Sequence, residues 1–162
     1  MPDWLKEYLP YIIPLYIVGM WILVTYWIAL TAGWRLLAKR FRLEGDFMGQ
    51  RWNMQSARMR WMARYNNSLT VGADETGLFL VPFILFRVWH PALFIPWVEI
   101  TALNGTELLF FKYVELRLGR SENVPLRIRE GLAEKLQAAA GKGWPTGSNQ
   151  AWELQQPPPP IG

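Results

Sequence analysis

The chain has 162 residues, no cysteine and one histidine, His90. These counts exclude disulfides, thiolate metal sites and cysteine nucleophiles, and they argue against a histidine-built metal centre or a Ser-His-Asp triad. Hydrophobic residues make up 51% of the chain and charged residues only 19%, whereas soluble domains carry about 25% charged residues. The apolar excess is therefore expected in a membrane or against a partner, and the formal net charge of +4 suits anionic lipid or nucleic acid.

No charged residue occurs between positions 8 and 34. We predict a transmembrane helix over 11–33, because about 20 apolar helical residues cross a bilayer core, with Pro14 in its first turn. A cleavable signal peptide is the alternative, but no basic segment precedes the apolar run, and the run exceeds the ~7–15 residues of such signals. No other apolar run reaches spanning length, so one span is expected.

Four basic residues follow this run: Arg35, Lys39, Arg40 and Arg42. By the positive-inside rule they place the N-terminus outside and the main domain in the cytoplasm. We expect 34–44 to continue as a helix along the membrane surface, with these cations toward headgroups and Leu36, Leu37 and Phe41 toward lipid.

Small residues recur within the predicted span at four-residue intervals, as Thr25, Ala29 and Gly33. Such a ridge lets a second membrane helix approach closely. Because small residues also occur in membrane helices without a partner, both interpretations stay open.

The middle of the chain has the patterns of antiparallel β-structure. Residues 57–65 alternate between apolar and basic side chains, which indicates a strand, with a bulge near Gln55. Further strands are expected at 69–73, 78–88, 93–100 and 107–118, with turns at 66–68, 74–77 and Asn104-Gly105. The strand at 93–100 is almost wholly apolar, which predicts that Phe94, Ile95, Trp97 and Ile100 contribute to the core or its rim.

An amphipathic helix is predicted to begin at Pro125 and to end at Gly141. Ile128, Leu132, Leu136 and Ala139 share one face of it. After Lys142 the composition turns to Gly, Pro, Gln and Ser, with four prolines at 157–160, so this tail is expected to be disordered alone. Its Trp144 and Trp152 are candidate anchors on a partner. The chain thus divides into an anchor with its interfacial helix (1–44), a β-domain (45–141) and a tail (142–162).

Two segments carry a resemblance: Gly77-Leu78-Phe79-Leu80, and Phe94-Ile95-Pro96-Trp97-Val98-Glu99-Ile100. They resemble bacterial pleckstrin-homology-like (PH-like) and GRAM-like domains. Three longer segments, 33–42, 69–80 and 90–100, look more specifically like an uncharacterised family of single-span bacterial membrane proteins. The resemblance implies a mainly-β barrel of seven strands closed by a C-terminal α-helix, α+β overall, in the bacterial inner membrane. Its implied role is lipid or protein binding, with no activity to carry over.

No group of residues in the sequence forms a credible catalytic site. His90, between Trp89 and Pro91, is expected to cap a strand connection rather than to bind a metal. Glu99 is expected to make a structural hydrogen bond rather than to act as a base. We therefore predict a protein that is not an enzyme, with no metal and no cofactor.

Basic residues are concentrated between positions 35 and 64, where eight of them oppose only Glu44 and Asp46. The topology signal explains the first four, whereas Arg58, Arg60 and Arg64 form a candidate surface for anions. Proximity to the membrane favours lipid headgroups over nucleic acid, which is not expected as a partner.

Two functions are considered, and the first is favoured. The first is an accessory subunit that braces a larger integral-membrane complex, bioenergetic or photosynthetic for example, because ten Trp exceed the need of one small core. Its partners would be other membrane subunits and membrane lipid. The second is a stand-alone module that binds anionic lipid or protein at the cytoplasmic face.

Overall fold

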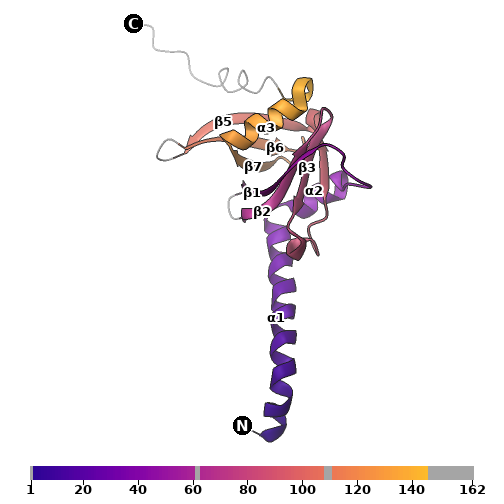
Figure 1. Cartoon of the computed structure of the whole chain (residues 1–162), viewed down its shortest axis with the longest axis vertical. Helices are drawn as coiled ribbons and strands as arrows, with labels where there is room; N and C mark the ends of the chain where they lie inside the picture. The colour runs from indigo at the N-terminus through magenta and orange to yellow at the C-terminus, as the bar shows by residue number, and fades with distance from the viewer. Residues whose placement is uncertain (1, 61–62, 108–110, 146–162) are drawn as a thin grey trace.

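The computed structural model describes residues 2–60, 63–107 and 111–145. A long helix, α1 (Asp3–Thr31), extends as a rod from a compact β-domain (Figure 1). It is long and apolar enough to cross a membrane. It begins at Asp3, so Pro10 and Pro14 both lie inside it, and the prediction that Pro14 occupies the first turn is wrong.

A left-handed residue, Gly33, separates α1 from a second helix, α2 (Trp34–Phe41). Its φ of +80° lies in the region that favours glycine, and the chain there turns out of the axis of α1. Trp34, Leu37 and Phe41 are consequently buried in the core of the β-domain. The expectation that 34–44 continue along the membrane with Leu37 and Phe41 toward lipid is therefore wrong.

Seven antiparallel strands form one strongly curved, nearly closed sheet in the order β4-β3-β2-β1-β7-β6-β5 (Figure 1). Helix α3 (Glu130–Ala140) covers the end of this barrel away from α1. The expected long N-terminal helix, seven-stranded barrel and C-terminal helix are thus confirmed. The strands are β1 (Gln50–Met59), β2 (Ala63–Ala73), β3 (Gly77–Pro82), β4 (Leu93–Pro96), β5 (Ile100–Glu107), β6 (Phe111–Leu118) and β7 (Val124–Arg129). The part of the chain that the structure describes also contains three short 3-10 helices, η1 (Ile84–Phe86), η2 (Trp97–Glu99) and η4 (Gly141–Gly143).

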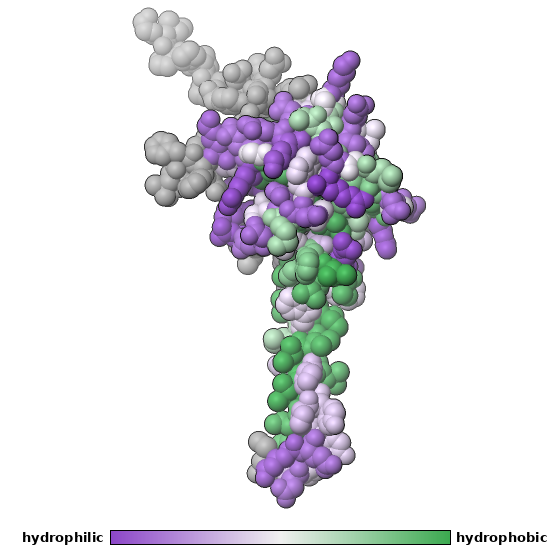
Figure 2. Space-filling view, in the orientation of Figure 1, coloured by the Kyte–Doolittle hydropathy of each residue, from purple (hydrophilic) through white to green (hydrophobic). Residues whose placement is uncertain are grey.

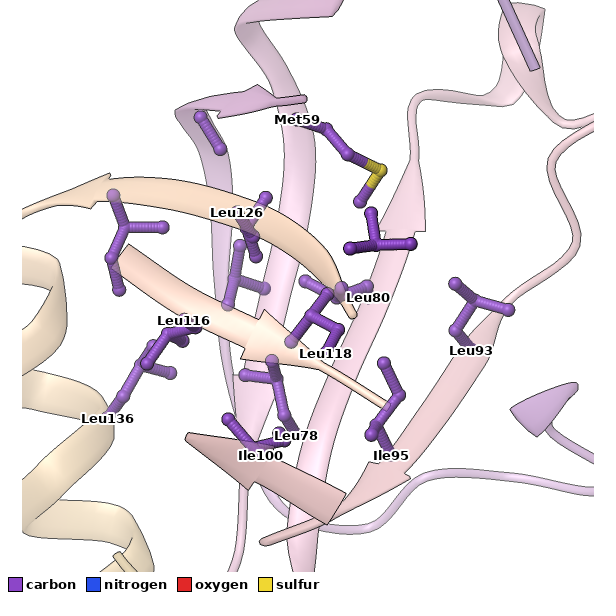
Figure 3. Close-up of a cluster of buried hydrophobic side chains, with 14 of the residues drawn as sticks. Met59, Leu78, Leu80, Leu93, Ile95, Ile100, Leu116, Leu118, Leu126 and Leu136 are labelled. Carbon is purple, nitrogen blue, oxygen red and sulfur yellow. The ribbon is translucent and has the colours of Figure 1, made fainter. Parts of the chain in front are cut away.

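The core fills the inside of the barrel with aliphatic side chains from facing strands and from α3 (Figure 3). Ile95, Trp97 and Ile100 are buried there. Phe94 packs against a second cluster built on Phe47 and Phe79. The predicted contribution of this apolar segment to the core is confirmed, because a segment without polar alternation has apolar contacts on both faces. The predicted single strand over 93–100 is wrong, because a 3-10 helix at Trp97–Glu99 separates β4 from β5.

Two predicted strand boundaries near the first hairpin are wrong. Residues 57–65 are not one strand but the hairpin between β1 and β2, with Met59 opposite Ala63. Strand β2 then continues through the predicted turn at 66–68, where Asn67 adopts a positive φ of 48°. The bulge near Gln55 is confirmed by register shifts on either side of that residue.

Two further boundaries are corrected in the second half of the chain. Asn104 and Gly105 lie inside β5, opposite Val114 and Tyr113, so the reversal comes after Glu107. The predicted helix start at Pro125 is wrong as well, because 124–129 form β7 between β1 and β6. Buried residues at every second position, rather than every third or fourth, mark this segment as a strand.

The predicted strand over 78–88 ends at Pro82. Residues 83–92 form instead an irregular connection that includes η1 and leads to β4. We call residues 83–92 the apolar connector.

Candidate anion-binding cleft

A cleft of about 570 Å³ lies on the outer face of the barrel, lined by β1, β2, β6, β7 and the first residues of α3. Five basic residues and one acidic residue contribute to its lining: Arg58, Arg64, Lys112, Arg127, Arg129 and Glu130. The Nζ of Lys112 lies 3.8 Å from Oε1 of Glu130. The cleft therefore carries an excess of positive charge.

The strand register places three of these arginines side by side. Arg58 on β1 is directly opposite Arg64 on β2 and directly opposite Arg127 on β7. Directly opposed residues project from the same face of a sheet, with Cβ atoms about 5 Å apart. Like charges at that spacing repel one another, and negative groups of the protein, such as Glu115 beside Arg127, offset part of this repulsion.

Glu115 on β6 supports one edge of the row. Its carboxylate accepts hydrogen bonds from Arg117 at 2.8 Å and from Arg127 at 2.9 Å. The guanidinium of Arg127 also stacks over the ring of Tyr113, 4.8 Å from its centroid. These contacts hold Arg127 in place beside Arg58, which preorganises this side of the cleft.

Of the three arginines singled out from the sequence, the structure brings together Arg58 and Arg64 but not Arg60. The side chain of Arg60 donates to the backbone oxygen of Thr31 at 3.3 Å. Thr31 is the last residue of α1, so Arg60 satisfies a carbonyl at the helix terminus. It joins the β1–β2 hairpin to α1 instead of lining the cleft.

The four cations after the apolar run have separate surroundings. Arg35 donates to the hydroxyl of Tyr26 at 3.0 Å. Arg40 bridges Glu99 at 3.1 Å and Glu122 at 3.6 Å. Lys39 and Arg42 are exposed. All four remain predicted headgroup contacts, although the bridges of Arg40 also tie α2 to the barrel.

The small-residue ridge is occupied by the protein itself. Thr25 and Ala29 are buried on the side of α1 from which Trp21 contacts the apolar connector. A side chain at Gly33 would lie 3.1 Å from Val124. The ridge therefore packs against this domain, and the interpretation as a free surface for another helix is corrected.

The two tryptophans of the tail are placed differently. Trp144 packs against Trp97, with ring centroids 5.4 Å apart. Trp152 lies outside the described residues. The candidate anchor that the structure describes is thus in contact with its own domain.

Sequence reasoning missed Lys112, Arg127 and Arg129. The assignment of 125–141 to a helix removed Arg127 and Arg129 from any sheet. The alternation of Val124, Leu126 and Ile128 was the available signal, because it leaves Arg127 and Arg129 on the outer face of a strand.

His90 is fully buried between the rings of Trp34 and Tyr65. Burial lowers the pKa of His90 to about 4, although a hydrogen bond with the backbone oxygen of Phe86 opposes the shift. The imidazole is therefore neutral at pH 7. Within residues 2–60, 63–107 and 111–145, no three His, Asp or Glu side chains are grouped so as to hold a metal ion.

Glu99 takes the structural role that its apolar strand suggested. Its carboxylate accepts from Arg40 at 3.1 Å and from the backbone N–H of Arg120 at 3.2 Å.

Comparisons of the chain with protein-family models, with curated proteins and with solved structures find no match. A functional assignment must therefore be argued from the cleft and from α1.

Proposed function

We propose that this protein is a non-enzymatic, single-span membrane protein whose PH-like domain binds a phosphate-bearing anion at the cytoplasmic face. The observation that carries the proposal is the row of Arg64, Arg58 and Arg127 across three neighbouring strands. Guanidinium groups form paired hydrogen bonds with phosphate oxygens. A row of them lining one cleft suits a phosphate group better than any neutral ligand.

The position of the cleft supports a ligand at or near the membrane. Arg58 lies two residues from Arg60, about 7 Å along the strand, and Arg60 contacts the end of α1. Basic residues close to an anionic bilayer each contribute about 1 kcal/mol of attraction. The phosphate could belong to a lipid headgroup or to a soluble molecule, since both present the same chemistry to the cleft.

Titration of pyrophosphate into the full chain, held in nanodiscs of phosphatidylcholine, tests the cleft. We expect the Arg64→Gln/Arg129→Gln variant to bind about tenfold or more weakly, because two cleft cations are lost. The matched control is Lys135→Gln/Lys142→Gln, which removes the same charge at two exposed positions on α3 and η4. Equal affinities for the two variants would contradict the proposal.

A second arm of the experiment distinguishes the two sources of phosphate. If a lipid headgroup occupies the cleft, nanodiscs that contain phosphatidylglycerol should lower the apparent affinity for pyrophosphate by competition. The Arg64→Gln/Arg129→Gln variant should lose this competition. An affinity that does not depend on the lipid, beyond general electrostatic screening, would assign the cleft to a soluble anion.

The role of an accessory subunit stays a second candidate, and the position of Trp144 favours it. This residue lies half-buried on Trp97, so the Pro-rich tail begins at a fixed place on the domain. A partner could recognise a polyproline segment that starts there at low entropic cost. Deletion of residues 146–162 should then release the protein from a larger complex in native membranes, and unchanged comigration would contradict this candidate.

A further inference from the structure

The apolar connector, residues 83–92, exposes large hydrophobic side chains. Phe83, Ile84, Leu85, Val88 and Trp89 are between 38% and 64% exposed. Their concentration in one connection between strands gives a contiguous apolar surface of the kind that marks an interaction site.

This surface lies against α1. The indole Nε1 of Trp21 donates to the backbone oxygen of Leu85 at 3.3 Å, and the rings of Trp21 and Phe86 are 5.3 Å apart. Nearer the domain, Tyr26 and Trp89 pack edge to face at 5.1 Å. Figure 1 shows the connector beside the upper turns of α1, and Figure 2 shows the apolar surface of the helix continuing onto the underside of the domain.

One side of the last turn of α1 faces the protein and not lipid. Ala29 and Ala32 are fully buried by the protein, and Ala32 belongs to the core of the β-domain. We therefore place the edge of the bilayer nearer the N-terminus than the end of the 11–33 segment. Tyr26 marks a level for it, because Tyr26 contacts both Trp89 and Arg35, the pairing of aromatic and basic side chains typical of a membrane interface.

Helix geometry checks this level independently. A hydrocarbon core of about 30 Å takes about 20 helical residues, and 20 residues before Tyr26 lies Lys6, beside Glu7. The charged N-terminal flank thus falls at the opposite interface. Trp21 and the contact with Leu85 are then about 7.5 Å below Tyr26, at 1.5 Å per residue.

We propose that the apolar connector is a second membrane-inserted element. It inserts into one leaflet beside α1 and anchors the domain to the bilayer. The occupant of its exposed surface is lipid hydrocarbon. This inference rests on the membrane anchoring in the proposed function, but not on the cleft.

The one charged residue of the connector is compatible with this placement. Arg87 donates from Nε to the backbone oxygen of Pro82 at 3.3 Å, so its guanidinium is directed back toward the strand end. A long arginine side chain can keep its charge among headgroups while its stem crosses apolar surroundings. This orientation allows the connector to insert while the charge of Arg87 stays at the level of the headgroups.

Single cysteines test the insertion, because the chain has none of its own. The full chain in nanodiscs would carry Leu85→Cys, Val88→Cys, Val18→Cys or Met48→Cys. Val18 is an exposed apolar position of α1 and serves as the membrane control. Met48 is 91% exposed and lines a shallow cleft with Ala139 of α3, away from α1, so it serves as the water control.

We expect an impermeant maleimide to label Met48→Cys and to leave Leu85→Cys and Val18→Cys unlabelled. A fluorophore attached before reconstitution should be quenched by lipid-borne nitroxides at both protected positions. Leu85 should respond most to a nitroxide near the headgroups, and Val18 to a deeper one. Val88→Cys repeats the test at a second exposed position in case one variant folds poorly.

Each other outcome overturns the inference in a distinct way. Labelling of Leu85→Cys with protection of Val18→Cys would leave α1 in the membrane and the connector outside it. Protection of Leu85→Cys without quenching by lipid would show that protein covers the connector. Labelling of Val18→Cys would overturn the anchoring itself, and with it the proposed function.

Discussion

The side chain of Trp21 reaches the backbone of Leu85, 64 residues later in the chain, through a hydrogen bond of 3.3 Å. Together with the ring of Phe86, this contact fixes one side of α1 to the connection between β3 and β4. Because the connector leads directly into the barrel, the domain is held at a set orientation relative to α1 and not on a flexible linker. A surface cleft on such a domain keeps a constant position relative to α1.

Replacement of Trp21 should weaken this attachment. Trp21→Ala removes a hydrogen bond and an aromatic pair, which together contribute about 1–3 kcal/mol. We expect faster hydrogen exchange at the amides of Phe86 and Arg87, whose hydrogen bonds stabilise η1. Trp27→Ala is the matched control, because Trp27 is 61% exposed. Equal exchange in the two variants would show that Trp21 does not hold the connector.

Gly33→Ala should destabilise the junction between α1 and α2. The added Cβ would meet Val124 at 3.1 Å, and Gly33 has a φ of +80°, which costs a side chain about 1–2 kcal/mol. Gly19→Ala is the opposite case: Gly19 has nothing within 4 Å, and alanine favours a helix interior by about 0.5–1 kcal/mol. Thermal unfolding in detergent should show a lower midpoint for the first variant and an unchanged or higher one for the second.

Trp97→Ala should be severely destabilising. The ring is 3% exposed and its Nε1 donates to the backbone oxygen of Asp74 at 2.8 Å. The loss of such a buried aromatic costs about 3–5 kcal/mol. The neighbouring Val98→Ala, at a position 70% exposed, should change stability by less than about 0.5 kcal/mol. Similar unfolding midpoints for both variants would place Trp97 outside the core.

Stability should fall as the pH is lowered through the range set by His90. Burial lowers the pKa of His90 to about 4 from 6.5. Between these two pH values the imidazole is protonated in the unfolded chain and neutral in the folded chain. The neutral imidazole's contribution is complete above about pH 6.5 and is lost progressively toward pH 4, about 3 kcal/mol in total.

Thermal unfolding between pH 7.5 and 4.5 would measure this dependence, with His90→Phe as the control. The variant should have a flatter profile over that range, whatever its absolute stability. Partial burial raises the pKa of Asp74, but three hydrogen bonds from Thr76 and Gly77 outweigh it and lower the pKa below its ordinary value. The contribution of Asp74 is therefore present above the ordinary carboxyl pKa and is lost as the pH falls below it, a lower range than that of His90. Parallel profiles for the two proteins would contradict the role assigned to His90.

Local sequence pattern determined several features of this protein. An uncharged run between positions 8 and 34 determined that α1 exists, since neither charge nor glycine-proline clusters interrupt it. Asp74 determined the turn before β3, because its side chain accepts from the backbone N–H groups of Thr76 and Gly77. The lack of polar side chains around Ile95 determined that this segment is buried. Each of these depends on residues a few positions apart.

Only the tertiary structure decided which residues share the cleft and which residues of α1 the domain buries. Arg127 stands beside Arg58 because β7 pairs with β1, a contact between segments about 70 positions apart that periodicity does not report. Leu37 is in the core because the chain turns at Gly33, and the apolar connector is exposed because β3 ends before it. Strand pairing and the direction of a chain after a turn depend on contacts distant in sequence. A local pattern specifies a buried face but not the surface that covers it.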